Sequence, residues 1–302
     1  MESEVEQELK RKIAAIADDR GPIKFLLVGR TGVGKSSTIN SLLGTELAPV
    51  GKFNPTTMDI TSYSYTHDDI DYQIYDTPGL CDDLPEQGNN DKYLKKISDT
   101  VKKIDLLWFV TELSATRLSG AEREGIKLIT KAMGPKIWQH AIIVFTRADF
   151  SDEESFNLDL KERTRIIHSE IRKNAPRLKS DIPAIAISNS SSLLPDGTHW
   201  LGELFTKIFE QINERVAIKF LISMRNDIGI GEKHETSGKK HIEPPRIPLS
   251  KGQQQRIRIN ALDRLKNAAA GTAAGVAVGK YFGKPGVIAG AIIGFLCGLF
   301  SD

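Results

Sequence analysis

The segment from Gly29 to Ser37, GRTGVGKSS, places three glycines, a lysine and two serines directly after the apolar run IKFLLVG. Its spacing, Gly-x-x-x-x-Gly-Lys-Ser, is that of a phosphate-binding loop between a strand and a helix. Backbone N–H groups and a helix N-terminus can wrap a polyphosphate, and glycine lets the backbone approach it closely. We predict that Lys35 reaches the β and γ phosphates and that the Ser36 hydroxyl binds Mg²⁺. The predicted phosphate-binding residues are Gly29, Arg30, Thr31, Gly32, Val33, Gly34, Lys35, Ser36 and Ser37.

A second group of candidates surrounds the expected metal. Asp76 and Gly79 belong to the sequence Asp-Thr-Pro-Gly, which ends the run YQIYD. An aspartate there can meet the Mg²⁺ shell, usually through water, and the glycine N–H can reach a γ-phosphate. Between the two groups, GKFNPTTMDI supplies Thr56 and Thr57, and either threonine can close over the metal. Thr57 is favoured, so the predicted metal set is Ser36, Thr57 and Asp76.

A third group of candidates is suited to reading a purine base. Asp149 follows the apolar run AIIVFT within VFTRAD. Its carboxylate can accept both the N1–H and the N2 amino hydrogens of guanine, a pattern that adenine does not offer. Thr146 and Arg147 stand where the usual motif has Asn and Lys, and the flat guanidinium can lie along the base. Ser188 and Asn189 follow PAIAI and are expected to cover the base. A surface salt-bridge aspartate is the alternative for Asp149.

The elements that position these residues alternate along the chain. Short apolar runs predict buried strands, and longer amphipathic runs between them predict helices, which together indicate an α/β fold. Such alternation predicts a P-loop domain with a mostly parallel sheet and helices on both faces, followed by a C-terminal apolar helical hairpin. The expected strands are 23–29, 72–76, 105–111, 141–146 and 183–188, and the expected helices are 35–44, 90–104, 119–133, 154–174 and 199–221.

The domain organisation follows from changes in composition. A helix is expected within 1–21, and the nucleotide-binding domain is expected to cover 22–222. The stretch 223–260 contains eight Lys/Arg against four Asp/Glu, with scattered prolines and glycines, and is predicted to be a basic linker. Residues 261–302 are predicted to form the hairpin.

The order GRTGVGKS, PTT, DTPG, TRAD and SNS is the order of motifs in a GTPase domain. The more specific segments are YDTPGLCDD, IWQHAIIVFTRAD and TELSATRLSGAEREGIKLITKAMG. On these segments the chain resembles the septin-like (paraseptin) group, which includes the GTPases of immunity-associated proteins and the chloroplast outer-envelope translocon receptors. The resemblance covers about 22–222 and implies GTP or GDP with Mg²⁺ as cofactors, and GTP hydrolysis.

Hydrolysis is expected to need help. Leu80 stands where many small GTPases carry a glutamine that orients the attacking water, so the intrinsic rate should be low. By resemblance, dimers face each other across their nucleotides, and the arginine of a conserved box acts across that interface. Arg117 is the candidate for that catalytic role, worth about 10³–10⁵ in rate where it is established. The alternative is a surface arginine that caps a helix or pairs near Glu122, and Arg30 is a weaker second candidate.

The C-terminal tail carries glycines at a spacing of four, which places each set along one helical face. Two short apolar helices, separated by a GKPG turn, predict a hairpin that inserts wholly or partly into a membrane. A glycine-zipper pair packed on soluble protein is the alternative. The glycines are Gly271, Gly275, Gly279, Gly286, Gly290, Gly294 and Gly298, and the basic residues expected at the headgroups are Arg256, Arg258, Arg264 and Lys266.

Composition limits the function classes. The 302 residues contain 41 Lys+Arg against 39 Asp+Glu, so no nucleic-acid partner is predicted. Cys81 and Cys297 are far apart, and the charged start MESEVEQELKRK is unlike a secretory signal, which predicts the cytosolic face of a membrane with a C-terminal anchor. The predicted function is a GTP-dependent dimerising switch. The alternatives are a scaffold that binds GTP without hydrolysing it, and a GTPase-gated, membrane-perturbing glycine-zipper protein.

Overall fold

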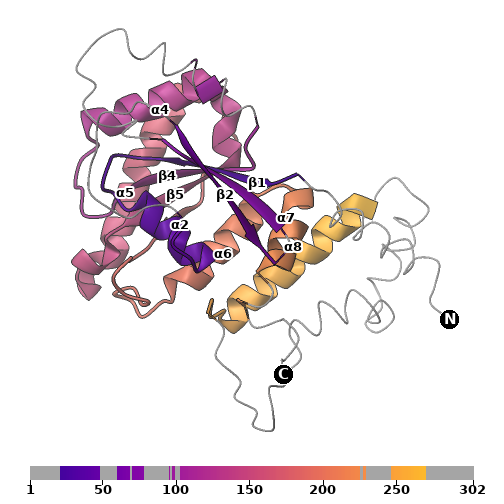
Figure 1. Ribbon diagram of the computed structural model, residues 1–302. Coiled ribbons are helices and arrows are strands. Elements are labelled where there is room, and N and C mark those ends of the chain that lie inside the picture. The colour runs from indigo at the N-terminus through magenta and orange to yellow at the C-terminus, as the bar shows by residue number, and fades with distance from the viewer. Residues whose placement is uncertain are drawn as a thin grey trace, which may run out of the picture. The chain divides into compact units, whose positions relative to one another are not determined.

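A computed structural model describes residues 21–47, 60–68, 70–77, 95, 97–98, 103–224, 227–228 and 246–269. The described residues fall into two compact units (Figure 1). The first unit comprises 22–66 and 71–211 and holds the phosphate-binding loop. The second gathers Gly21, the described residues of 67–70, and those from Ile212 onward. Predictions for the N-terminal helix, Thr56, Thr57, Gly79, Leu80 and the glycine-rich tail beyond Ala269 lie outside the described residues.

The first unit is built on a six-stranded sheet with the order β2-β3-β1-β4-β5-β6. Within this order, the neighbours β3-β1, β1-β4, β4-β5 and β5-β6 all pair in parallel, as expected from the alternation of strands and helices. β2 was not expected from the sequence, and its side-chain pairs Ser64–Gln73 and Thr66–Asp71 show that it runs antiparallel to β3. The strands are β1 (Ile23–Val28), β2 (Thr61–His67), β3 (Ile70–Asp76), β4 (Leu106–Glu112), β5 (Ala141–Thr146) and β6 (Ala184–Ala186).

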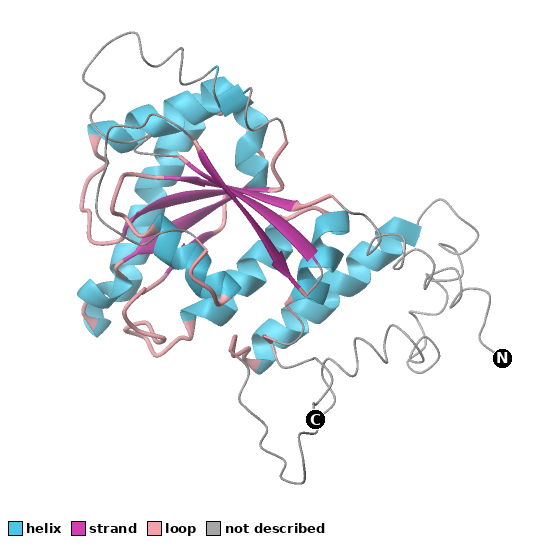
Figure 2. Ribbon diagram, in the orientation of Figure 1, coloured by secondary structure: helices cyan, strands magenta, loops and turns pink. Residues whose placement is uncertain are grey.

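Helices cover both faces of this twisted sheet (Figure 2). α2 packs with α6 on one face, and α4 packs with α5 on the other, which confirms the predicted α/β P-loop architecture. The central strands are fully buried because both faces are covered, and Trp108 of β4 packs its ring 5.6 Å from that of Phe25. The helices of this unit are α2 (Lys35–Leu43), α4 (Gly120–Met133), α5 (Glu153–Asn174) and α6 (Trp200–Gln211), with 3₁₀ turns η1 (Pro135–His140) and η2 (Ala148–Phe150).

The single helix expected over 199–221 is wrong. The structure contains two helices there, α6 and then α7 (Glu214–Ser223), which belongs to the second unit. The break falls at Asn213, whose side-chain oxygen accepts a hydrogen bond from the Val216 N–H at 3.1 Å. An asparagine at this position caps a new helix instead of continuing the old one.

The basic linker predicted over 223–260 is also wrong in its last part, because α8 (Lys251–Ala269) begins inside it and crosses the boundary expected at 261. Ser250 and Gln253 exchange two hydrogen bonds, backbone N–H to side-chain oxygen in each direction, which is a capping box. Ile257 and Ala261 are fully buried on one face of α8, which packs on α7 within the second unit. Within the described residues, no helix combines the length and the apolar character needed to cross a membrane.

Candidate nucleotide-binding site

The phosphate-binding loop runs from the end of β1 into the first turn of α2. Gly32 and Gly34 have φ angles of 77° and 96°, a left-handed region that favours glycine. Gly34 is the residue before the helix and offers no side-chain cap, so the first N–H groups of α2 are directed back toward the loop without an intrahelical acceptor. Arg30, Thr31 and Gly32 are exposed along the loop, whereas Val33 is buried and anchors it. The predicted loop therefore has the backbone shape that an anion requires.

The lysine of this loop is buried and points back over it. Lys35 Nζ donates hydrogen bonds to the carbonyl oxygens of Gly29 and Arg30, both at 3.1 Å. The same ammonium lies 3.8 Å from Oδ1 of Asp76, at the end of the neighbouring strand β3. The structure thus brings a positive charge and the predicted metal-site carboxylate together at the mouth of the loop.

The residues present fit a magnesium ion. Ser36 Oγ donates a hydrogen bond to Asp76 Oδ2 at 3.3 Å, so two of the three predicted metal residues are adjacent. Asp76 Oδ1 is buried and has no hydrogen-bond partner among the described residues. The Lys35 ammonium, 3.8 Å away, lies beyond hydrogen-bond distance, so this oxygen still has room to bind Mg²⁺ or a metal-bound water. Thr57, the third predicted ligand, lies outside the described residues.

The electrostatics of Asp76 reflect the same arrangement. Burial raises the pKa of Asp76 above its ordinary value, while Lys35 and the Ser36 hydroxyl act in the opposite direction. Tyr63 of β2 was missed by sequence reasoning, although it lies within electrostatic reach of this carboxylate. Burial raises the pKa of the Tyr63 hydroxyl, and the Asp76 charge raises it further.

The chain leaves β3 in a fixed direction after Asp76. Thr77 is fully buried, and both its backbone N–H and its hydroxyl donate to the Leu27 carbonyl of β1, at 3.2 and 3.0 Å. These bonds extend the β1–β3 pairing by one residue and hold Asp76 beside the phosphate-binding loop. The next predicted site residue, Gly79, lies outside the described residues.

The second residue of the predicted base motif has an unusual backbone conformation. Arg147 has a φ of 58°, one of two non-glycine residues with positive φ in the described part of the chain. Its guanidinium donates to the Gly32 carbonyl at 3.2 Å and pairs with Glu112 Oε1 at 2.9 Å. Arg147 therefore ties the base motif to the phosphate-binding loop, while its side chain stays half exposed.

Asp149 presents a carboxylate at the surface of the same motif. Its Oδ2 accepts a hydrogen bond of 2.6 Å from the Ser190 hydroxyl. Burial alone would raise the pKa of Asp149, but hydrogen bonds from Ser190 and Ser188 outweigh it, and the pKa lies below its ordinary value. The group is therefore ionised at neutral pH and is an acceptor only, as the readout of guanine requires.

The other predicted base-site residues have separate positions. Asn189 Nδ2 lies 3.5 Å from the Gly34 carbonyl and 3.4 Å from Thr38 Oγ1, so this loop covers the start of α2. Ser188 is buried, and its hydroxyl accepts from the N–H groups of Ser190 and Ser191, which closes the turn. Thr146 is also buried and donates to the Thr111 carbonyl at 3.3 Å, so it links β5 to β4 beneath the site.

The candidate catalytic arginine lies in the loop between β4 and α4. The Arg117 side chain is exposed, and the capping role that the sequence left open belongs instead to Ser119, which forms a capping box with Glu122. Glu122 pairs with Arg163 of α5, a residue that the sequence analysis did not single out. Arg163 is only 2% exposed.

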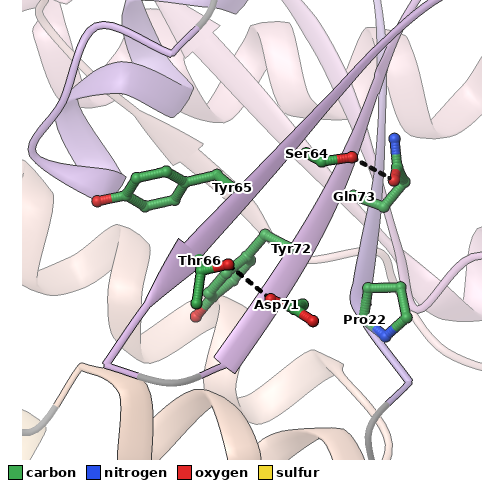
Figure 3. A pocket seen from close by; sticks show the side chains of 7 residues that line it. All are labelled: Pro22, Ser64, Tyr65, Thr66, Asp71, Tyr72 and Gln73. Carbon is green, nitrogen blue, oxygen red and sulfur yellow. Dashed lines mark hydrogen bonds between the residues drawn. The ribbon is translucent and has the colours of Figure 1, made fainter.

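A separate hollow of about 290 Å³ lies along the β2–β3 hairpin and Pro22 (Figure 3). Ser64 bonds to Gln73 and Thr66 to Asp71 across it. Tyr72, one of its lining residues, pairs in register with Ile23, at the start of β1. The phosphate-binding loop follows the other end of β1, so this hollow is not part of the candidate nucleotide site.

The fold and the site together define a P-loop GTPase. Comparison with known proteins agrees: the AIG1 family matches residues 23–175, half of the chain, and the chain belongs to that family. The family resemblance inferred from the sequence is thereby confirmed.

Proteins similar to this chain include chloroplast translocases and GTP-binding protein A of Dictyostelium discoideum, which is 28% identical over 306 residues, covering 86% of this chain and 68% of that protein. Translocase of chloroplast 34 of Arabidopsis thaliana is 32% identical over 212 residues, which are 64% of this chain and 66% of that protein. The chain therefore spans about two thirds of the length of this relative. A structure of Toc33 of Arabidopsis thaliana with Mg²⁺ and GMPPNP has a TM-score of 0.53 at 25% identity, covering 73% of this chain and 95% of the chain in that structure. A structure concerned with dimerization and GTPase activity of atToc33 and psToc159 has a TM-score of 0.55 at 24% identity, covering 70% of this chain and 91% of that one.

Proposed function

We propose that this chain binds GTP and GDP with Mg²⁺, hydrolyses GTP, and switches by dimerising through its nucleotide face. The observation that carries the proposal is the arrangement at one edge of the sheet. Arg147 and Asn189, from the base motifs, both bond to the glycine carbonyls of the phosphate-binding loop, and Asp76 lies beside Lys35 at its mouth. Ligands of open α/β sheets bind at this carboxyl edge.

Each residue has a defined task in this proposal. The loop amides and Lys35 bind the β and γ phosphates, and Asp149 accepts the guanine N1–H and N2 hydrogens. Ser36 and Asp76, with Thr57, hold Mg²⁺, which neutralises phosphate charge when it is bound. Arg147 lies along the base, and Asn189 closes the rim above α2. The complex of Toc33 with Mg²⁺ and GMPPNP supports this set of cofactors.

Calorimetry tests the binding step. The full-length chain titrated with GDP in Mg²⁺ should release heat and saturate at one site per chain, and the same titration with ADP should give no saturable heat. Omission of Mg²⁺ should weaken the affinity for GTP more than that for GDP, because a metal held by Ser36 and Asp76 would neutralise the larger charge of the triphosphate. Equal heats with guanine and adenine nucleotides would contradict the assignment of Asp149.

The dimerising step places Arg117 against the partner's nucleotide. Its side chain is exposed in the β4–α4 loop of the unit that holds the site. Dimerization is important for GTPase activity in atToc33 and psToc159, which supports the same arrangement here. Single-turnover hydrolysis measured at rising protein concentration should show a rate per molecule that increases and then saturates. The Arg117→Ala variant should keep nucleotide binding and lose that increase.

A scaffold that binds GTP and turns it over little is the second candidate, favoured by one observation. Leu80 follows Gly79 where a glutamine would orient water. A scaffold requires nucleotide-dependent dimers whose rate per molecule stays flat as they form. Molecular mass measured by light scattering in GDP and in a non-hydrolysable GTP analogue, beside the rate, separates the two functions.

The membrane is the proposed place of action, with 261–302 as a C-terminal anchor at a cytosolic face. Support comes from the glycine register of the tail and from the relative that is a chloroplast translocase. Its first part, 261–269, belongs to α8. Full-length protein should float with liposomes after an alkaline wash, and Ile288→Asp combined with Ile292→Asp should not. Leakage of liposome contents in GTP would instead favour the membrane-perturbing alternative.

A further inference from the structure

A buried ion pair lies beneath the loop that carries Arg117. Arg163 of α5 and Glu122 of α4 are 2% and 3% exposed, and Arg163 Nη2 donates to Glu122 Oε1. A buried guanidinium needs partners for all its nitrogens, and this one has them. Its remaining bonds all go to β4 and the loop after β4, which begins at Leu113 and ends at Ser119.

Arg163 contacts both the end of β4 and the loop that follows it. Its Nε donates to the Glu112 carbonyl at 3.3 Å, and its Nη2 donates to Thr111 Oγ1 at 3.1 Å, at the end of β4. Its Nη1 donates to the carbonyl of Arg117 itself at 3.2 Å. The guanidinium therefore holds the backbone of the candidate catalytic arginine, while the side chain of that arginine remains exposed.

Glu122 fixes the far end of the same loop. Its Oε2 accepts from the Ser119 N–H at 2.7 Å, and its own N–H donates to Ser119 Oγ at 3.1 Å. Its Oε1 accepts from both Arg163 and the Thr111 hydroxyl. The loop is thus held at Glu112, at Arg117 and at Ser119 by one pair of side chains from two helices.

Stability alone does not account for this pair. Removing two charges from water costs free energy that their attraction often fails to recover, and apolar residues of similar volume are frequently as stable. What an apolar pair cannot do is bond to three separate backbone groups of a loop. Planar, multidentate donation is specific to arginine, and lysine cannot reproduce it.

We propose that Arg163, held by Glu122, is a positioning residue that fixes the Arg117 loop for action on the nucleotide of a second copy of this chain. The inference rests on the proposed function, in which Arg117 acts in trans. Ordering loop residues costs conformational entropy, and if the loop is already ordered in the monomer, dimer formation does not incur that cost. Loosening the loop should therefore reduce the rate of the dimer about tenfold or more.

The test compares two variants of the full-length chain. Arg163→Lys keeps a positive charge beside Glu122 but loses the bonds to Glu112 and Arg117. The double variant Glu122→Gln/Arg163→Met removes both charges, so its melting temperature should stay near that of the unchanged protein. Both variants should keep GDP affinity within about twofold and lose about tenfold of the concentration-dependent hydrolysis rate. Recovery of the full rate in the double variant would overturn positioning, because stability would then explain the effect.

A background that lacks Arg117 gives the sharper comparison. If Arg163 acts through Arg117, then Arg163→Lys should have no further effect on the rate of Arg117→Ala, since coupled residues are not additive. An equal tenfold loss on both backgrounds would show that Arg163 acts elsewhere, and the proposal would fail.

Hydrogen exchange separates this proposal from the proposed function. In GDP-bound protein at low concentration, amides of 113–119 should exchange about tenfold faster in Arg163→Lys than in the unchanged chain. If exchange in 113–119 is unchanged, Arg163 does not hold this loop, and the proposal fails whatever the hydrolysis rates show. If the rate of the unchanged protein does not rise with concentration, or Arg117→Ala keeps that rise, the trans function fails. Positioning for hydrolysis then fails with it, even where the exchange result shows that Arg163 holds this loop.

Discussion

Replacement of Gly29 by alanine tests the placement of the phosphate-binding loop. Gly29 directly follows β1, and a Cβ added to it would lie closer than 3.0 Å to the Val110 carbonyl oxygen of β4 and 3.1 Å from its carbonyl carbon. The obstructing atoms are backbone in the middle of a buried sheet, and β1 pairs with β4 up to Val28 and Phe109. Neither strand can move without breaking that pairing, so the loop has to shift.

The magnitude follows from the cost of overpacking. An extra carbon forced into a close-packed interior costs about 1–3 kcal/mol, and this one meets an immovable carbonyl, so about 2 kcal/mol is expected. For a domain of this size that corresponds to a fall in melting temperature of roughly 4–8 °C. The shift also moves one of the two carbonyls that hold Lys35, so GDP affinity should fall by about tenfold or more.

Differential scanning fluorimetry and fluorescent-GDP titration measure the two effects. Gly120→Ala is the matched control, because an added Cβ there meets nothing within 4 Å. Gly120 is the first residue of α4, where alanine is the better helix former, so the control should melt at or slightly above the unchanged protein. If Gly29→Ala melts within 1 °C of the control and binds GDP normally, the close approach of β1 and β4 at this point is wrong.

Three further changes follow from the carboxylates. Asp149→Asn should weaken the affinity for GDP by about 10²-fold and strengthen that for xanthosine diphosphate, because the C2 carbonyl of xanthine can accept from the amide. A competition assay measures both affinities. Asp76→Asn should abolish the Mg²⁺ dependence of GTP affinity. It should not lower the melting temperature of the nucleotide-free protein, because burial raises the pKa of Asp76, and its negative charge destabilises the fold once pH rises through the folded-state pKa. Burial alone would raise the pKa of Asp227, but hydrogen bonds from His67 and Arg246 outweigh it and hold the pKa below its ordinary value. The ionised carboxylate therefore stabilises the fold above about pH 3.8, and this stabilisation is lost as pH falls through the folded-state pKa. In Asp227→Asn the melting temperature should therefore fall less steeply as the pH is lowered, which melting curves recorded over a series of acidic pH values would show.

The parts of this fold that the sequence predicts are those coded locally. The phosphate-binding loop is fixed by its own glycines, and the central strands β1, β4 and β5 are nearly continuous apolar runs because helices cover both faces. β2 carries no such signal. Its residues TSYSYTH place half-buried Tyr63, Tyr65 and His67 between exposed neighbours, a period-two pattern that a search for continuous apolar runs does not find.

The parts of the site that sequence reasoning missed depend on distant partners. Arg163 lies within the charged helix α5, where helical spacing places it on the same face as the buried Phe156, Ile167 and Ile171, but its charge favoured an exposed position. Its burial is decided by Glu122, 41 positions earlier on α4. Thr146 shows the converse, since its place in the motif predicts contact with the nucleotide, yet its hydroxyl is directed to Thr111 of β4.

The end of β4 is where these distant contacts meet. The Glu112 side chain pairs with Arg147 of the base motif at 2.9 Å, and its backbone carbonyl accepts from Arg163 at 3.3 Å. The side-chain pair is partly exposed and contributes at most about 1 kcal/mol, whereas the backbone bond belongs to a buried network. One residue thus joins the loop predicted to read the base to the loop that carries Arg117. If the nucleotide binds against Arg147 as proposed, we expect the two loops to be coupled through this strand end.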